Sequence, residues 1–181
     1  MQTEVIFAGF GGQGIMLIGQ MLAYAGLSEG KNVVWLPSYG PEMRGGTAYC
    51  TVVVSDQAIG SPIIDRPGGI VVLNRPSLGK FGARVRPGGV LIINSSIIDV
   101  RSDRTDIQQI LMPANQIAIE GGSAKAANMA VLGAFVGRTQ VVKLDTLRTL
   151  VRKQFEKKPQ FIEVNLRVLQ RGYELGASSS Y

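Results

Sequence analysis

Short apolar runs alternate with helical patterns over the first part of the chain. Residues 3–8 form an apolar run typical of a buried strand, and residues 13–29 repeat apolar side chains at the spacing of one helical face. Gly30 stands where a helix C-terminal cap is common, and a second apolar run follows at residues 32–36. Residues 3–36 therefore predict a β–α–β unit with two parallel strands and a right-handed crossover.

The remaining pattern first predicts mainly strands and then only helices. Apolar or alternating runs predict four further strands, at residues 47–55, 68–74, 90–96 and 107–112. Helices are expected at residues 75–85, from Pro113, at residues 124–136, at residues 145–157 with Asp145 as the cap, and from Pro159 to about Gly176. Residues 177–181 are expected to form a frayed tail.

These elements predict one α/β domain over residues 1–181, with a Rossmann-like, mostly parallel sheet flanked by helices and a helical C-terminal third. With 181 residues, 45% of them hydrophobic, the chain can bury a substantial core. We find no uninterrupted apolar run of about 18 residues that would span a bilayer, and residues 1–8 lack the features of a secretory signal. We therefore expect a cytoplasmic protein without a membrane segment.

Four glycines in six positions connect the first strand to the first helix. The stretch GFGGQG places Gly9, Gly11 and Gly14 at the G-x-G-x-x-G spacing, and Gly12 adds a fourth glycine. Such a cluster permits a sharp turn and close approach of the backbone, and the N–H groups that open the helix can bind a phosphate. Gln13 can add a side-chain amide to this cradle. The alternative is a tight, closely packed turn without a ligand.

The segment SYGPEMRGG, residues 38–46, predicts a loop at the same edge of the sheet. Ligands of open parallel sheets bind beyond the carboxyl ends of the strands, and this loop follows the second strand. Its arginine can bind phosphate or carboxylate through two hydrogen bonds, its glycines permit close approach, and its hydroxyls can bind polar groups. The candidate ligand contacts are Ser38, Tyr39, Arg44, Gly45 and Gly46. The alternative is a surface loop with a structural pair between Glu42 and Arg44.

Polar residues also follow a later strand. Asn94 and Ser95 come after the apolar run VLII and are expected to face the same crevice. Ligand contact and capping of the next segment are equal alternatives for them. Asn128 lies in a small-residue helical segment, where we expect a buried polar anchor rather than a ligand contact.

The cysteine and histidine counts narrow the chemistry. The chain has one cysteine, Cys50, and no histidine. It therefore lacks the commonest general base and transition-metal ligand, and it cannot build a cysteine-based cluster alone. Cys50 stands in an apolar, β-branched run, which favours a buried structural thiol. We predict no catalytic residue and no metal site, so the composition favours a binding or partner subunit.

The net charge of +6 leaves several partner classes open. Residues 143–171 hold eight basic side chains and three acidic ones. This excess suits an acidic protein, a polyphosphate ligand or a solvated helical face. No aromatic-interleaved basic motif accompanies it, so we do not expect nucleic acid as a partner.

A free-standing reductase that binds NAD or FAD is the main alternative for the glycine motif. A dinucleotide site expects an acidic residue at the end of the second strand, where it binds a ribose hydroxyl. Here the second strand ends with Leu36 and Pro37, and Glu42 is displaced into the following loop. This departure disfavours the reductase.

Four stretches together resemble the gamma subunit of the 2-oxoacid:ferredoxin oxidoreductases: GFGGQGIMLIGQMLAYAG, NVVWLPSYGPEMRGGTAYCTVVVS, RPGGVLIINSS and NMAVLGAFVG. The resemblance extends from about Val5 to about Gly172, and the two glycine motifs are far more specific in combination than apart. The compact length and the sequence of the SYGPEMRGG segment resemble the 2-oxoglutarate type most. The branched-chain 2-oxoacid, pyruvate and indolepyruvate types stay open.

The resemblance implies a subunit of a larger enzyme. Such enzymes convert a 2-oxo acid to acyl-CoA and carbon dioxide and reduce ferredoxin. Thiamine diphosphate, Mg and iron–sulfur clusters are then expected on partner alpha, beta and, in many members, delta subunits. The gamma chain is associated with coenzyme A binding and active-site closure, so the isolated chain is expected to be inactive. Placing the coenzyme A diphosphate on Gly11, Gly12, Gln13 and Gly14 is our inference from the glycine motif. Arg44 has an alternative place against a partner subunit near the thiamine site.

Overall fold

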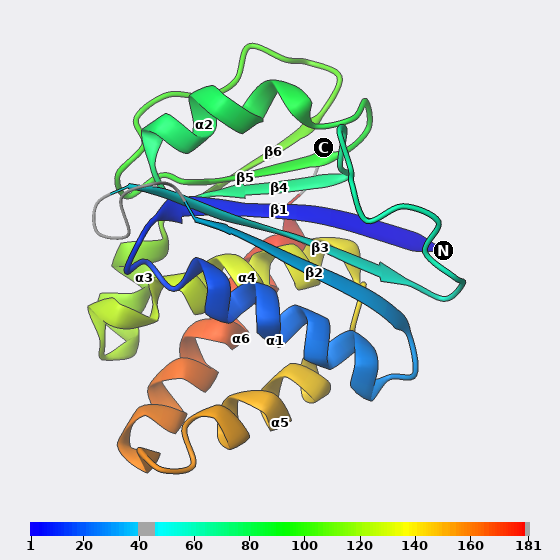
Figure 1. Cartoon of the computed structure of the whole chain (residues 1–181). Helices are drawn as coiled ribbons and strands as arrows, with labels where there is room; N and C mark the ends of the chain where they lie inside the picture. The colour runs from blue at the N-terminus through cyan, green and yellow to red at the C-terminus, as the bar shows by residue number, and fades with distance from the viewer. Residues whose placement is uncertain (40–45, 180–181) are drawn as a thin grey trace.

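Six strands form one sheet in the order β2-β3-β1-β4-β5-β6 (Figure 1). The computed structural model describes residues 1–39 and 46–179. The strands are β1 (Gln2–Phe10), β2 (Asn32–Tyr39), β3 (Thr47–Ser55), β4 (Gly69–Val72), β5 (Val90–Asn94) and β6 (Gln108–Met112). The helices are α1 (Ile15–Ser28), α2 (Arg75–Phe81), α3 (Ala114–Gly121), α4 (Ala127–Thr139), α5 (Leu144–Gln154) and α6 (Ile162–Ser178). Short 3₁₀ turns span Gly82–Arg84, Ala124–Ala126 and Pro159–Phe161.

The sheet is mostly parallel, as predicted. Strands β1, β4, β5 and β6 run in the same direction, and only β3 runs against its neighbours β1 and β2. The carboxyl ends of five strands therefore meet at one edge, on the left in Figure 1. The α/β fold class is confirmed, with the candidate ligand residues expected at that edge.

The predicted β–α–β unit differs from the structure in one respect. Strands β1 and β2 do point the same way, but β3 lies between them and pairs with both. Strand β3 is buried along most of its length, whereas β2 is largely exposed and contains Pro37. Proline donates no ladder hydrogen bond, so within sheets it is largely confined to edge strands. Strand β2 is such an edge strand.

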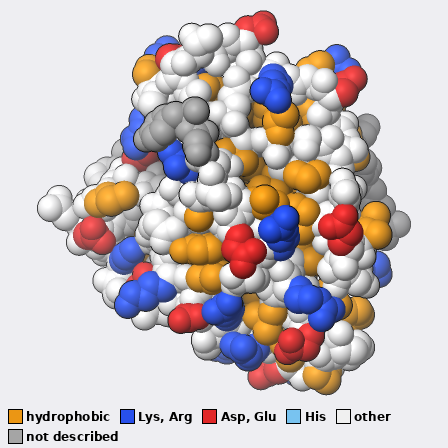
Figure 2. Space-filling view, turned by 180° about the vertical axis from the view of Figure 1, so that it is seen from behind, with side chains coloured by type: hydrophobic (Ala, Val, Ile, Leu, Met, Phe, Trp, Pro, Cys, Tyr) orange, Lys and Arg blue, Asp and Glu red, His pale blue; other side chains and the backbone are white. Residues whose placement is uncertain are grey.

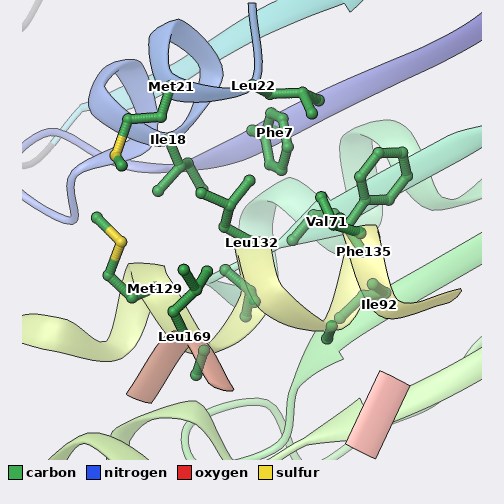
Figure 3. Packing of buried hydrophobic residues seen from close by; sticks show 14 of the residues in the cluster. Phe7, Ile18, Met21, Leu22, Val71, Ile92, Met129, Leu132, Phe135 and Leu169 are labelled. Carbon is green, nitrogen blue, oxygen red and sulfur yellow. The ribbon is translucent and has the colours of Figure 1, made fainter. Parts of the chain in front are cut away.

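Helices cover the two faces of the sheet unequally. Helix α2 lies on one face, and α1, α3, α4, α5 and α6 lie on the other (Figure 1). The larger core lies under these five helices, where the rings of Phe7 and Phe135 meet edge to face with centroids 5.9 Å apart. Figure 3 shows Leu132 of α4, Ile18 of α1 and Leu169 of α6 packed together in this larger core.

The first helix begins and ends at glycines. Helix α1 starts at Ile15, two residues later than predicted, because Gly14 adopts a left-handed conformation in front of it. At its other end Gly30 has φ 76°, as its predicted capping role requires. Its N–H donates to the carbonyl of Leu27, and the N–H of Lys31 donates to that of Gly26, each over 3.0 Å. These two bonds form a Schellman motif.

The predicted cap of α5 is wrong. Asp145 lies inside the first turn of α5 and pairs with Arg148 instead of capping the helix. The cap comes from the end of α1, where Glu29 Oε1 accepts the N–H of Lys143 at 2.7 Å and the hydroxyl of Thr146 at 2.8 Å. A contact between residues more than 110 positions apart leaves no local pattern in the sequence.

The C-terminal helices pack against each other through glycines. A Cβ added to Gly133 would lie 2.2 Å from the carbonyl oxygen of Leu169, and one added to Gly172 would lie 2.0 Å from that of Ala130. Helices α4 and α6 therefore touch backbone to backbone. Helix α6 continues through Ser178, so the tail expected from residue 177 begins later than predicted.

No helix in the described residues combines the length and hydropathy that crossing a membrane requires.

Candidate functional site

The glycine loop between β1 and α1 requires glycine for its backbone conformation. Gly12 has φ 92° and Gly14 has φ 75°, a region that side chains with a Cβ rarely adopt. A Cβ on Gly14 would also lie 2.3 Å from Asn128 Nδ2. On Gly12 it would meet no atom of the described residues within 4 Å. Gly12 therefore presents bare backbone to open space, as close approach by a ligand requires.

Helix α1 adds hydrogen-bond donors to this loop. Its first backbone bond runs from the N–H of Ile18 to the carbonyl of Gly14, over 3.2 Å. The N–H groups of Ile15, Met16 and Leu17 precede that bond and have no acceptor within the helix. The first turn contains no acidic side chain, so nothing there opposes the positive end of the helix dipole. The loop and helix start therefore suit an anionic group.

A cleft of about 290 Å³ lies beside the glycine loop. It brings together five predicted site residues, namely Gly11, Gly12, Gly14, Tyr39 and Gly46. The N–H of Gly11 donates to the carbonyl of Gly46 at 3.1 Å, which ties the loop to the start of β3. The Tyr39 side chain is 60% exposed and forms part of the opposite wall.

The cleft is also lined by residues that the sequence motifs did not predict. They are Phe10, Ile15, Met16, Leu17, Thr47 and Ala48. All of them flank the two glycine motifs directly. Their position next to the motifs is the feature of the sequence that could have predicted them. They make most of the wall apolar, which is common in small-molecule sites with a few placed polar groups.

Gln13 lies in the loop, but its side chain turns inward. Its Oε1 accepts the N–H of Phe10 at 2.6 Å, and its Nε2 donates to the carbonyl of Leu73 at 3.2 Å. A Cβ on Gly9 would lie 2.6 Å from the same Oε1. Gln13 therefore braces the loop against β1 and β4, and Gly9 makes room for that side chain.

The second predicted segment begins differently from the prediction. Ser38 and Tyr39 belong to β2, opposite Tyr49 and Ala48 of β3, instead of to a loop. Because successive side chains of a strand point to opposite faces, Tyr39 reaches the cleft and Ser38 does not line it. Arg44 and Gly45 lie outside the described residues, and their roles remain predictions.

Asn94 and Ser95 lie at the same sheet edge but do not line the cleft. Asn94 is fully buried, and its Oδ1 accepts the N–H of Ala114 at 3.2 Å, which caps the start of α3. Its Nδ2 donates to Asn115 Oδ1 at 2.9 Å. The backbone N–H of Ser95 donates to Met112. Asn94 therefore caps α3, which follows β6, rather than the next segment along the chain, and a ligand role for Asn94 and Ser95 stays a prediction.

The positive charges gather away from the cleft. Among the cleft residues that the structure describes, none is a lysine or arginine. A shallow groove of about 610 Å³ between α5 and α6 is lined instead by Arg148, Arg152, Arg167 and Arg171. Acidic residues are mixed with them, as the lower part of Figure 2 shows. The described cleft therefore offers backbone N–H groups, and no lysine or arginine side chain, to an anionic group.

Two protein relatives match almost the whole chain. Ketoisovalerate oxidoreductase subunit VorA of Methanothermobacter marburgensis is 40% identical over 173 residues, covering 94% of this chain and 36% of the relative. 2-Oxoglutarate synthase subunit KorC of Methanocaldococcus jannaschii is 32% identical over 178 residues, covering 97% of this chain and 94% of the relative. The chain thus spans about a third of the VorA length and nearly all of KorC.

Solved structures share the fold. The gamma subunit of a keto/oxoacid ferredoxin oxidoreductase from Geobacter sulfurreducens superposes with a TM-score of 0.84 at 29% identity, covering 98% of this chain and 99% of that chain. A 2-oxoglutarate:ferredoxin oxidoreductase from Magnetococcus marinus, with 2-oxoglutarate, coenzyme A and succinyl-CoA bound, gives a TM-score of 0.90 at 23% identity. This match covers 99% of this chain and 32% of that chain. Residues 4–175 match the family described as pyruvate ferredoxin/flavodoxin oxidoreductase, and the chain therefore belongs to that family.

Proposed function

We propose that the chain is the gamma subunit of a 2-oxoacid:ferredoxin oxidoreductase and that its glycine loop binds coenzyme A. The assembled enzyme would oxidatively decarboxylate a 2-oxo acid, form acyl-CoA and reduce ferredoxin. The observation that carries the coenzyme A assignment is the cleft beside Gly12 and the start of α1. The N–H groups of Ile15, Met16 and Leu17, which have no acceptor within α1, match the negative charge of a diphosphate.

The size of the cleft indicates which part of coenzyme A it holds. Its volume of about 290 Å³ lies at the lower end of small-molecule sites, which span about 300–1,000 Å³. It therefore accommodates the diphosphate and an adjoining group, and the rest of the molecule extends beyond it. Phe10, Met16 and Tyr39 offer apolar and aromatic surface to that adjoining group. The Magnetococcus relative, which holds coenzyme A, supports this ligand.

The other cofactors of the reaction fit partner chains better than this one. One cysteine cannot supply the thiolates of an iron–sulfur cluster, and the sequence contains no histidine. The single thiol, on Cys50, is buried. Thiamine diphosphate, when bound, activates the 2-oxo acid for decarboxylation, and we place it with Mg on the alpha and beta subunits. This chain then contributes ligand binding and closure.

The 2-oxo acid is proposed to be 2-oxoglutarate, because the segment SYGPEMRGG resembles the 2-oxoglutarate type most. The full-length match to a KorC subunit supports it. A branched-chain 2-oxo acid is the second candidate, because the VorA relative is 40% identical over its matching third. The acid itself would contact mainly the partner subunits, so a substrate panel on the assembled enzyme distinguishes the two.

Gly12→Val tests the coenzyme A assignment. The valine would cover the exposed backbone of the loop, so the assembled enzyme should show a KM for coenzyme A raised about tenfold or more, a loss of ~1.4 kcal/mol or more of binding free energy. The measurement is the initial rate of viologen reduction against coenzyme A concentration, together with equilibrium dialysis of labelled coenzyme A.

Gly30→Val is the matched control. Gly30 also has a positive φ, 76°, and an added Cβ there meets no described atom within 4 Å, but it lies at the other end of α1. It therefore introduces similar backbone strain without touching the cleft. An unchanged KM and Kd in Gly12→Val would remove coenzyme A from the glycine loop.

A further inference from the structure

Two amide side chains tie the glycine loop to other elements. The Gln13 side chain accepts the N–H of Phe10 and donates to the carbonyl of Leu73, directly after β4. Asn128, in the first turn of α4, donates its Nδ2 to the carbonyl of Gly14 at 3.3 Å. Asn128 itself is buried, at 6% exposure. Together they connect the loop to β4 and to α4.

Such bracing matters because the loop is built of glycine. Glycine loses more conformational freedom on ordering than any other residue, and four of the six residues from Gly9 to Gly14 are glycine. An unbraced loop would have to become ordered when the ligand binds, at the expense of affinity. The carbonyl held by Asn128 is also the one that accepts the first backbone bond of α1, from Ile18. Its position therefore fixes where the free N–H groups of α1 point.

Neither side chain lines the cleft in the described structure. From this geometry we propose that Gln13 and Asn128 are positioning residues that preset the glycine loop for its anionic ligand without contacting it. The inference rests on the proposed function, since coenzyme A is the ligand whose binding would report the loop conformation. Under this proposal, α4 in the helical third of the chain contributes to the affinity for coenzyme A through Asn128.

Asn165 offers a matched control for Asn128. It is also buried, at 7% exposure, and its Nδ2 also donates to a backbone carbonyl, that of Phe161, at 2.8 Å. Its partner lies before α6, in the C-terminal helical part of the chain. Replacing either asparagine with alanine removes one partly buried hydrogen bond, so both variants should lose similar stability. Only the Asn128 variant should alter the glycine loop.

The test uses the assembled enzyme, purified through a tag on this chain together with its partner subunits. Asn128→Ala removes one hydrogen bond and should raise the Kd for labelled coenzyme A about three- to tenfold. Gln13→Met removes two and should raise the Kd at least as much. The KM for coenzyme A should rise in parallel while kcat at saturating coenzyme A stays within about twofold. Asn165→Ala and the exposed Gln154→Met should leave Kd and KM unchanged while thermal melting reports any loss of stability.

Equal Kd values for coenzyme A in Asn128→Ala and Asn165→Ala would overturn the proposal. The hydrogen bond from Asn128 to Gly14 would then contribute to stability only. If Asn128→Ala does not assemble, Gln13→Met decides the question by the same readout. A raised Kd in Gly12→Val with normal values in both positioning variants would refute this inference alone. No effect in Gly12→Val would refute the assignment of coenzyme A to the glycine loop, and this inference with it.

Discussion

Gly19 allows helix α1 to lie directly on the side chain of Cys50. A Cβ at that position would come within 2.4 Å of Cys50 Sγ and within 3.0 Å of Trp35 Nε1. Cys50 is fully buried, and its thiol makes a long contact of 3.6 Å with the carbonyl of Ile15. Burial raises the pKa of the Cys50 thiol from its usual 9.0 to about 12, and the Trp35 N–H opposes this only in part. The predicted structural thiol is therefore confirmed as buried.

We predict that Cys50 resists thiol reagents in the folded chain. At pH 8 the native thiol should stay protonated and covered, whereas guanidinium should release one reactive thiol per chain. The measurement is the reaction with Ellman's reagent before and after unfolding. Rapid reaction of the native chain would contradict the buried position.

The same thiol makes a pH-dependent contribution to stability. Below pH 9 both the folded and the unfolded chain keep the thiol proton, so Cys50 adds no pH dependence there. Between pH 9 and about 12 the unfolded chain loses the proton first, and the free energy of unfolding should fall as pH rises. Denaturant unfolding of the wild type and Cys50→Ala at pH 8 and pH 10 measures how much of the pH dependence of the free energy of unfolding is due to Cys50.

At the scale of elements, the contact between α4 and α6 depends on the absence of side chains. Gly133 and Gly137 on α4 face Gly172 and Gly176 on α6, and each lies close to a backbone carbonyl of the other helix. Such spacing lets two helices approach until their backbones touch. Small residues in the sequence indicated close packing of α4, but the partner helix is visible only in the fold.

Gly172→Ala should destabilise the chain. Its Cβ would lie 2.0 Å from the carbonyl oxygen of Ala130, so the helices would have to separate at a cost of about 1–3 kcal/mol. The helical Gly79 is the control, because a Cβ there meets none of the described atoms within 4 Å. Gly79→Ala should be neutral or stabilise by up to about 1 kcal/mol. Urea unfolding of both variants measures the difference, and equal stabilities would contradict the packing.

Local pattern predicted the elements well and their partners poorly. The strand at residues 47–55 and the glycine end of α1 follow from side-chain alternation and from a backbone that needs glycine, both of which are local. The cap of α5 by Glu29 and the insertion of β3 between β1 and β2 join segments distant in the sequence. No local propensity reports such contacts.

The candidate site shows the same division. The glycine motif predicted Gly11, Gly12 and Gly14 at a cleft, because the spacing itself creates the loop and the helix start. The inward turn of Gln13 and the burial of Asn94 depend on which neighbours satisfy their amides. Those neighbours come from β4 and α3, and the motif alone carries no information about them.

At the scale of the whole molecule, the two regions that bear on function lie on different elements. The cleft beside the glycine loop opens at the carboxyl edge of the sheet, between the glycine loop, β2 and the start of β3. The arginine-lined groove lies on α5 and α6 in the helical third. The described cleft is too small to enclose a whole coenzyme A molecule, which is consistent with the proposed role of this chain as one subunit of a larger enzyme.

The most direct test of the central claim is to purify the assembly that contains this chain and assay coenzyme A-dependent viologen reduction. The substrates are 2-oxoglutarate, 2-oxoisovalerate, pyruvate and indolepyruvate, each with and without coenzyme A. We expect larger partner chains to co-purify and one of these acids, 2-oxoglutarate first, to support reduction only when coenzyme A is present. An intact, folded chain that purifies without partners and reduces viologen with none of the four acids would contradict it.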